Sequence, residues 1–308
     1  MNYQKILEDI YKKIKPELKK GEVANYIPAL AKVKKEQFAM SITLQDGTSY
    51  HVGEFEKKFS IQSISKVFGF SLALKLYGKE LYKRVGVEPS GNPFNSLVQL
   101  EYEKGIPRNP FINAGAIVIT DFLINYYKDE DKALWEVLNF VREISDNKSI
   151  DFNPEIAKSE LLHGHRNLAL ANLMKSFNNL DNDVRDVVTT YFKQCSIEMN
   201  TKELSRAMHY LAFGGKDLIT NKEFLTKSKA RRVNAVMLTC GHYDASGEFA
   251  YHVGLPGKSG VGGGIVAVVP NLMSIAVWAP ALNKYGNSYA GTLALEMFVE
   301  KTGVSIFG

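Results

Sequence analysis

The stretch Phe59-Ser60-Ile61-Gln62-Ser63-Ile64-Ser65-Lys66 runs directly into the apolar segment Val67-Phe68-Gly69-Phe70-Ser71-Leu72-Ala73-Leu74. It places Ser63 and Lys66 three residues apart at the start of a predicted helix, where residues at this spacing share a face. A serine hydroxyl becomes a nucleophile when a nearby base takes its proton. A lysine becomes that base when an apolar setting lowers its pKa. The stretch therefore predicts a Ser-Lys nucleophile pair, and the alternative is a capping serine followed by a solvent-reaching lysine.

A second motif, Lys258-Ser259-Gly260-Val261-Gly262-Gly263-Gly264, precedes a predicted strand. Its glycines permit close backbone approach. A Lys-Ser/Thr-Gly triplet downstream of S-x-x-K is typical of penicillin-recognising serine enzymes. The run does not fit the phosphate-loop pattern, which leaves a plain glycine-rich turn as the alternative.

Composition narrows the class of protein. The chain has 308 residues, of which 45% are hydrophobic and 23% charged, and its net charge of +5 is spread without a basic face. We therefore expect no nucleic-acid binding. No apolar run approaches the ~20 residues of a membrane span, and two cysteines without a C-x-x-C pair favour neither a metal nor a redox site. Two acidic residues, Glu8 and Asp9, lie within the first ten positions, where an export signal needs an apolar run, so we predict a cytoplasmic protein that binds no membrane.

The periodicity predicts helices and strands in a definite order along the chain. Asp46-Gly47 between two alternating runs, 38–45 and 48–53, indicates a β-hairpin. Apolar spacing predicts helices at 6–14, 63–77, 111–127, 133–144, 167–177, 183–195, 202–213 and 287–302, and strands at 249–254, 264–269 and 273–279.

This order predicts an α+β fold within a single domain, 1–308. An antiparallel sheet built from both termini and flanked by helices would form one lobe, approximately 1–58 and 245–308. The residues from approximately 59 to 244 would form a helical lobe, with a site in the cleft between the two.

Several polar residues could line such a site. They are Asn113, Glu160, Asn167, Tyr191 and Tyr243. Each also has an ordinary structural interpretation, as a helix cap, a surface group or a core tyrosine whose hydroxyl is hydrogen-bonded. His163 and His165 lack a third ligand at a sensible spacing, so we expect no metal there.

Five motifs in this order resemble the serine-dependent glutaminases over roughly residues 20 to 300. They are Gln62-Ser63-Ile64-Ser65-Lys66, Phe111-Ile112-Asn113-Ala114-Gly115-Ala116-Ile117, Arg166-Asn167, Tyr191-Phe192-Lys193-Gln194-Cys195-Ser196-Ile197 and Lys258-Ser259-Gly260-Val261. The resemblance implies a β-lactamase-like fold, hydrolysis of L-glutamine to L-glutamate and ammonia, no cofactor, and a homodimer or homotetramer. The loop 212–220 departs from the family's pattern, so the resemblance does not fix its conformation.

The resemblance also implies a role for each matching residue. Ser63 would be the nucleophile and Lys66 its base, Tyr191 and Tyr243 would assist proton transfer, and Val261 would donate its backbone N–H, with Ser259 and Gly260 in support. Tyr26, Asn113, Glu160 and Asn167 would hold the amino-acid end of glutamine.

Two other functions remain open. One is a β-lactamase or DD-peptidase acting on the same scaffold. The other is a non-catalytic glutamine sensor that retains the pocket, although a protein that only binds glutamine needs neither Ser63 nor Lys66.

Overall fold

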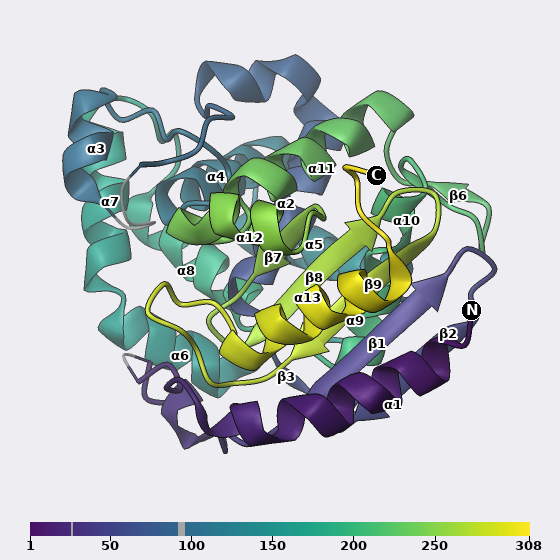
Figure 1. Cartoon of the computed structure of the whole chain (residues 1–308). Helices are drawn as coiled ribbons and strands as arrows, with labels where there is room; N and C mark the ends of the chain where they lie inside the picture. Colours follow the sequence, from purple (N-terminus) through teal and green to yellow (C-terminus); the bar gives the residue numbers. More distant parts are fainter. Residues whose placement is uncertain (26, 92–95) are drawn as a thin grey trace.

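A five-stranded antiparallel sheet, built from both ends of the chain, forms the centre of the computed structural model, which describes residues 1–25, 27–91 and 96–308 (Figure 1). The strand order is β2-β1-β9-β8-β7. These strands are β1 (Ala39–Leu44), β2 (Ser49–Gly53), β7 (Gly257–Ser259), β8 (Gly264–Val269) and β9 (Met273–Trp278). Because β1 pairs with β9, with Ala39 opposite Trp278, the two ends of the chain are joined at the middle of the sheet.

The hairpin predicted around Asp46-Gly47 is confirmed. Gly47 adopts a φ of +88°, and the Asp46 carboxylate accepts a hydrogen bond from the Thr48 N–H at 2.9 Å. The alternation in β1 places Met40 and Ile42 in one core cluster, while the polar side chains between them face the other way. These are buried as well: the Ser41 hydroxyl lies 2.8 Å from that of Thr201. Both faces of the sheet are therefore covered.

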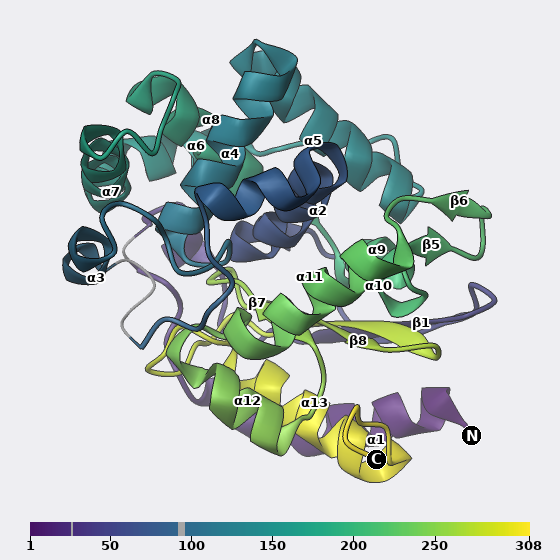
Figure 2. The ribbon, with the colours of Figure 1, turned by 90° about the horizontal axis from the view of Figure 1, so that it is seen from above.

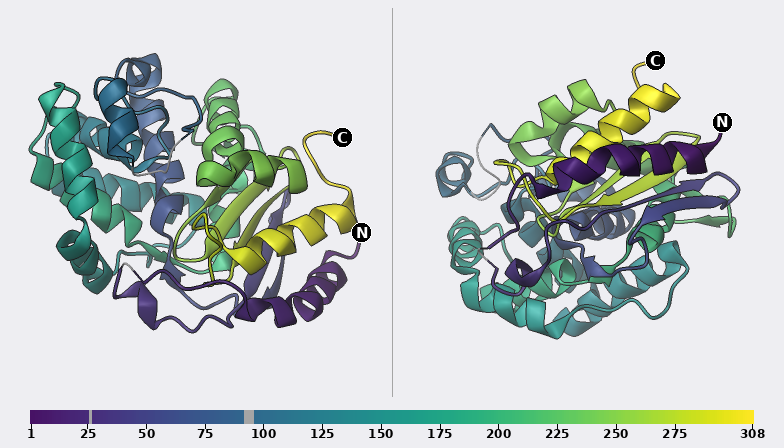
Figure 3. Two further views of the ribbon diagram at one scale, coloured as in Figure 1. Left: turned by 60° about the vertical axis from the view of Figure 1, so that its left-hand side comes forward. Right: turned by 60° about the horizontal axis from the view of Figure 1, so that its bottom comes forward.

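Helices cover the two faces in separate layers. They are α1 (Tyr3–Ile14), α2 (Ser65–Tyr77), α3 (Leu97–Tyr102), α4 (Asn113–Tyr127), α5 (Glu130–Ser145), α6 (Pro154–His163), α7 (His165–Ser176), α8 (Val184–Cys195), α9 (Thr201–Ala207), α10 (His209–Ala212), α11 (Lys227–Cys240), α12 (Ser246–His252) and α13 (Tyr289–Thr302). Figure 2 shows α1, α12 and α13 on one side of the sheet and α2, α4, α5 and α8 on the other. The terminal helices α1 and α13 pack side by side (Figure 3).

Shorter elements connect these layers. Single 3-10 turns are η1 (Lys15–Lys19), η2 (Leu30–Lys32), η3 (Gln62–Ile64), η4 (Gly78–Lys83) and η5 (Tyr243–Ala245). Two small ladders pair β3 (Phe59–Ser60) with β4 (Glu198–Met199), and β5 (Lys216–Asp217) with β6 (Lys222–Glu223).

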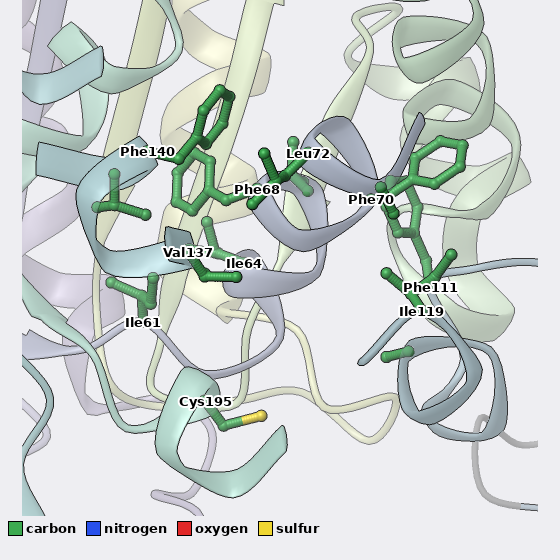
Figure 4. Close-up of a cluster of buried hydrophobic side chains, with 14 of the residues drawn as sticks. Ile61, Ile64, Phe68, Phe70, Leu72, Phe111, Ile119, Val137, Phe140 and Cys195 are labelled. Carbon is green, nitrogen blue, oxygen red and sulfur yellow. The ribbon is translucent and has the colours of Figure 1, made fainter. Parts of the chain in front are cut away.

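Helix α2 is the central helix of the larger layer. Every residue from Ser65 to Leu74 is buried, because α4, α5, α8 and α11 pack around it. Figure 4 shows Phe68 and Leu72 of this helix in one apolar cluster with Phe140 of α5. An apolar sequence on all sides predicts such an interior helix, and the prediction is confirmed.

The strand predicted at 249–254 is wrong. Residues 246–252 form helix α12, and Phe249 of this helix and Val253, the residue that follows its last turn, both enter the core beneath the sheet. A short apolar run satisfies either period, and here tertiary packing selects the helix. The edge strand lies further on, at Gly257–Ser259.

Helix boundaries differ in smaller ways. The helix predicted over 202–213 is two helices, α9 and α10, separated at Met208. Helices α3, α6 and α11 were not predicted.

The arrangement of one antiparallel sheet with helices on both faces is the α+β, β-lactamase-like fold that the resemblance implied. The lobe boundaries near residues 58 and 245 stay a prediction. Within the described ranges, the helices are all too short or too polar to cross a bilayer.

Candidate functional site

A cavity of about 310 Å³ opens beside the start of α2. It is bordered by η3, the beginnings of α4 and α7, the end of α6, one side of α8 and the glycine-rich loop after β7. Its lining residues are Ile27, Gln62, Ser63, Asn113, Glu160, His163, Gly164, Arg166, Asn167, Tyr191, Cys195 and Val261. The cavity therefore collects polar side chains from segments far apart in the sequence.

Ser63 and Lys66 lie at the floor of this region, on the turn η3 and in the first turn of α2. Their exposed fractions are 8% and 4%. No side chain caps either η3 or α2, so Ser63 is not a capping serine. Because Lys66 is buried, it does not reach solvent either. Both structural alternatives for this motif are therefore wrong.

The Lys66 amine is held by the start of α4. Its Nζ donates to the Phe111 carbonyl at 3.1 Å and to Asn113 Oδ1 at 2.7 Å. Burial lowers the pKa of Lys66 to about 8, although the nearby Cys195 and Glu160 oppose this shift. A substantial fraction of this lysine is consequently neutral near physiological pH.

Asn113 connects Lys66 to two other predicted residues. Its Nδ2 donates to Asn167 Oδ1 at 2.9 Å, and its Oδ1 accepts from the Tyr191 hydroxyl at 3.3 Å. The Lys66 amine also lies 5.9 Å from the centre of the Tyr191 ring. Residues of α2, α4, α7 and α8 thus form one hydrogen-bonded group.

Tyr243, on the turn η5, lies near Ser63. Its hydroxyl donates to the Ser259 carbonyl at 3.4 Å. Burial raises the pKa of Tyr243, and the neighbouring Ser63 hydroxyl opposes this rise. The Tyr243 φ of +55° is rare for a residue other than glycine, and such strain clusters at functional sites. Behind its ring, at 4.5 Å, lies the fully buried amine of Lys258, which also donates to the Ser259 carbonyl. Burial, reinforced by the charge of Lys66, lowers the pKa of Lys258 well below its ordinary value.

The glycine-rich loop packs directly against the turn that carries Ser63. A Cβ atom at Gly260 would lie 2.6 Å from the Ile61 carbonyl oxygen and 3.4 Å from the Ser63 nitrogen. At Gly262 it would lie 2.2 Å from the Ser60 carbonyl oxygen. The backbone of Val261 is therefore brought beside that of Ser63 only because side chains are missing on both sides.

Glu160, near the end of α6, contributes an almost fully buried carboxylate. Burial raises its pKa to about 7, opposed by a hydrogen bond from the Gln62 side chain and by the charge of Lys66. Its Oε1 is buried without a hydrogen-bond partner among the described residues. A buried acceptor of this kind is costly unless a ligand or water satisfies it.

Most of the predicted site residues are brought together. Ser63, Asn113, Glu160, Asn167, Tyr191 and Val261 line the cavity, and Lys66, Tyr243, Ser259 and Gly260 contact that group. Tyr26 lies outside the described residues. In the described ranges, no group of three His, Cys, Asp or Glu side chains could hold a metal ion.

Four polar or ionisable lining residues were not among the predicted site residues: Gln62, His163, Arg166 and Cys195. Gln62 and Arg166 directly precede predicted residues, and these two and Cys195 belong to the motifs quoted in the sequence analysis, whereas His163 was considered there only as a metal ligand. Cys195 lies one helical turn after Tyr191, and burial raises the pKa of its thiol to about 12.

Comparison with known proteins agrees with this geometry. A family profile described as Glutaminase matches residues 21–307. A glutaminase of Aliarcobacter butzleri is 62% identical over 307 residues, covering all of both chains, and one of Rhizobium etli is 54% identical over 303 residues, covering 98% of each.

Solved structures include one of the Bacillus subtilis glutaminase YbgJ in covalent complex with 5-oxo-L-norleucine, formed by reaction with 6-diazo-5-oxo-L-norleucine. It superimposes with a TM-score of 0.91 at 34% identity, covering 99% of this chain and 100% of the other. The profile match and these identities, together with a cavity built from the five motifs, show that the chain belongs to the glutaminase family.

Proposed function

We propose that this protein hydrolyses L-glutamine to L-glutamate and ammonia through a γ-glutamyl ester on Ser63. Family membership supports the overall reaction. The Ser-Lys chemistry is supported by the surroundings of Lys66 described above.

The observation that carries the proposal is the pair of acceptors around Lys66. A neutral amine has two N–H donors and one lone pair. The Phe111 carbonyl and Asn113 Oδ1 take the two donors. The lone pair is then free to accept a proton, and burial, which brings the pKa to about 8, makes this form accessible. Lys66 is therefore suited to act as the base for Ser63.

The reaction follows in two stages. The Ser63 oxygen attacks the side-chain amide carbon of glutamine while its proton passes to Lys66. The C–N bond then breaks, and ammonia leaves with a proton supplied by Lys66, Tyr191 or Tyr243. A water molecule attacks the ester carbon, loses its proton to the same groups, and releases glutamate with the Ser63 hydroxyl restored.

The oxyanion that forms in each stage would be held by the backbone N–H groups of Ser63 and Val261. Such a donor contributes roughly 3 kcal/mol to the transition state. Ser259 and Gly260 support this loop. The close packing of the glycines against residues 60–63 supports the assignment.

Substrate selection is assigned to the charged ends of glutamine. Glu160 would pair with the α-ammonium group, and Asn113, Asn167 and Tyr26 would hold the rest of the amino-acid end. A desolvated charge without a partner is unfavourable, so a substrate lacking one charged group should be rejected.

The direct test measures ammonia release from glutamine and labelling by 6-diazo-5-oxo-L-norleucine in wild type and in Ser63→Ala. We expect wild type to release ammonia from glutamine and to carry the label on Ser63 by peptide mass spectrometry. Ser63→Ala should lose both properties while staying folded. Ser71→Ala is the matched control and should keep both, because Ser71 is a buried serine of the adjoining helix α2 whose hydroxyl accepts from Tyr210. Appreciable turnover by Ser63→Ala would rule out the ester.

The same assays separate the two alternatives. Hydrolysis of nitrocefin without ammonia release would indicate a β-lactamase. Glutamine binding without turnover would indicate a sensor.

The homodimer or homotetramer and the cytoplasmic location stay predictions. Light scattering during size-exclusion chromatography would measure the oligomeric state.

A further inference from the structure

A second cavity, of about 250 Å³, lies between α12 and α13. Figure 2 shows both helices on the side of the sheet opposite α2. The cavity is lined by His242, Ala245, Glu248, Phe249, His252, Asn283, Asn287, Tyr289, Thr292, Leu293 and Glu296. Among the described residues, the lining of this cavity has no member in common with that of the cavity at Ser63. It is therefore a separate space, large enough for a small molecule of few heavy atoms.

His242 is a buried histidine of this cavity whose ring nitrogens are both unsatisfied. Its side chain is 1% exposed, and neither nitrogen has a hydrogen-bond partner among the described residues. The ring instead stacks on Phe249, with the ring centres 3.5 Å apart. Burial lowers the pKa of His242 well below its ordinary value, so the ring is neutral and offers one N–H donor and one acceptor nitrogen. Unsatisfied polar atoms on a buried ring are costly unless a ligand or water reaches them.

Asn287 adds a buried acceptor to the same space. Its side chain is 2% exposed, and its Nδ2 donates to the His242 carbonyl at 3.2 Å, whereas its Oδ1 has no partner among the described residues. An amide oxygen only accepts, while the neutral imidazole has one donor and one acceptor. The ligand group that satisfies this set is one that both donates and accepts, such as a hydroxyl or a primary amide.

The more exposed part of the lining carries negative charge. Glu248 is exposed and Glu296 is half-buried. His252 supplies positive charge only when it is protonated, and its Nδ1 lies 3.0 Å from Glu296 Oε1, so at least one negative charge stays in excess. A metal ion does not explain this set, because no group of three His, Cys, Asp or Glu side chains in the described part of the chain could hold one. The charge therefore favours an organic cation.

The loop from Asn283 to Asn287 lies between this cavity and the site of catalysis. Its two ends are held together, because the Asn283 side chain accepts from the Asn287 N–H at 3.2 Å and the Asn283 N–H donates to the Asn287 carbonyl at 2.8 Å. A Cβ at Gly286 would lie 3.8 Å from the side chain of Val261 and 3.9 Å from that of Tyr243. A ligand bound to Asn287 would thus contact a loop that also borders the first cavity.

We propose that this second cavity binds a small primary amine that also carries a hydroxyl or a primary amide, and that its occupancy alters turnover at Ser63. The uncharged group lies against His242 and Asn287, and the ammonium group faces Glu248 and Glu296. The binding site stands independently of the proposed function, whereas the effect on turnover rests on it.

Isothermal titration calorimetry with matched probes tests the binding. Aminobutanol and aminobutyramide, each with its two groups at opposite ends of the molecule, represent the hydroxyl and the amide. Pentylamine replaces the hydroxyl of aminobutanol by a methyl group, and pentanol replaces its amine. We expect a dissociation constant on the order of 1 mM for at least one of the two bifunctional probes, because so few atoms limit the affinity. Pentylamine and pentanol should bind at least about tenfold more weakly.

Substitutions locate the binding in this cavity. His242→Phe keeps the stacking on Phe249 and removes both ring nitrogens, so the affinity should fall about tenfold. Glu248→Gln changes an exposed side chain, serves if the phenylalanine variant does not fold, and should weaken binding about fivefold. Glu300→Gln, an exposed position of α13 outside the lining, is the matched control and should stay within about twofold of wild type. Glu160→Gln, which alters the first cavity, should do the same.

Binding and turnover fail separately. The site is overturned if neither bifunctional probe gives saturable heat, or if Glu160→Gln loses affinity and Glu248→Gln does not. With the probe at saturation, we expect kcat/KM for glutamine to change by about twofold or more in wild type, and a smaller change overturns the coupling to Ser63. If wild type does not turn over glutamine, the proposed function fails, and calorimetry still decides the site.

Discussion

The Lys66 amine donates to Asn113 Oδ1 at 2.7 Å, and this bond joins the first turn of α2 to the first residue of α4. The position of Asn113 beside the Lys66 amine depends on the segment before α4. There the Asn109 side chain accepts from the N–H groups of Phe111 and Ile112 at 2.9 and 3.1 Å. A Cβ at Gly115 would lie 1.9 Å from the Asn109 carbonyl oxygen, so glycine is required for this close turn. The acceptors around Lys66 are therefore fixed before any substrate binds.

Replacing Asn113 by aspartate should shift the pH dependence of kcat/KM. Lys66 acts when neutral, so kcat/KM should rise with pH through its pKa of about 8. In Asn113→Asp the new negative charge would stabilise the ammonium form and raise that pKa by roughly one unit or more. The rising limb should shift to higher pH by the same amount, and activity at pH 7 should fall accordingly. The profile of kcat/KM from pH 6 to 10 measures this, and an unmoved limb would contradict the role of Lys66.

Glu160→Gln should weaken glutamine binding without unfolding the protein. The variant keeps the shape of the side chain but cannot pair with the α-ammonium group, so KM should rise about tenfold to a hundredfold. Wild type should reject glutamine that lacks its α-amino group, and the variant should lose much of this discrimination. The ratio of kcat/KM for glutamine to that for glutamine without its α-amino group, measured in both proteins, tests whether Glu160 pairs with the α-ammonium group. Unchanged kinetics in Glu160→Gln would contradict this pairing.

Replacing Glu160 should also remove one of the two titrations that make kcat/KM rise with pH. Because Glu160 has a pKa of about 7 and binds the substrate when ionised, its titration adds to the rise that Lys66 causes. In Glu160→Gln only the Lys66 limb should remain, shifted below pH 8 because the charge of Glu160, which raises the pKa of Lys66, is lost.

Gly262→Ala should impair catalysis through the backbone of the loop. The added Cβ would lie 2.2 Å from the Ser60 carbonyl oxygen, so the loop must shift and move the Val261 N–H away from the oxyanion. The expected loss in kcat is on the order of a hundredfold. Gly247→Ala is the control, because a Cβ there meets no atom within 4 Å. Equal kcat values for the two variants would argue against a role for Val261.

Asp217→Asn should reduce stability far from the site. Asp217 is buried and accepts from Arg206 at 2.6 Å and from Thr220 at 2.5 Å, with His209 at 3.0 Å. Burial alone would raise its pKa, but these bonds bring the pKa well below the ordinary value. Breaking one partner of a buried pair costs roughly 3 kcal/mol of unfolding free energy at pH 7.

The sign of the pH effect follows from the lowered pKa. The stabilisation that comes from the lowered pKa of Asp217 is fully present above the unfolded pKa of about 3.9. It is lost as pH falls through the folded value. Urea unfolding at pH 7, 4 and 3 should therefore show the gap between wild type and Asp217→Asn narrowing with acid. Asp151→Asn, at an exposed pair with Arg142, should change stability by less than about 1 kcal/mol. A difference in unfolding free energy between the two proteins that stays constant with pH would contradict the stabilising role of the ionised Asp217.

The sequence alone determined the elements whose signals are local. The Asp46-Gly47 hairpin needs a positive φ at Gly47, and α2 is apolar on every side, so both were predictable from neighbouring residues. The motifs and the family resemblance likewise pointed to six of the residues that line the cavity, namely Ser63, Asn113, Glu160, Asn167, Tyr191 and Val261. Local signals failed at 249–254, where Phe249 and Val253 suit a strand or a helix equally well until the sheet provides a surface to cover.

Only the tertiary structure decided how the chemistry is arranged. Nothing in the sequence indicates that the partners of Lys66 are Phe111 and Asn113, or that Lys258 lies behind Tyr243. The two Lys66 contacts join residues 45 and 47 positions apart, and the pKa of each group depends on how completely other segments exclude water from it. A spacing pattern fixes which side chains share a helix face, whereas desolvation and distant hydrogen bonds exist only once the whole chain is packed.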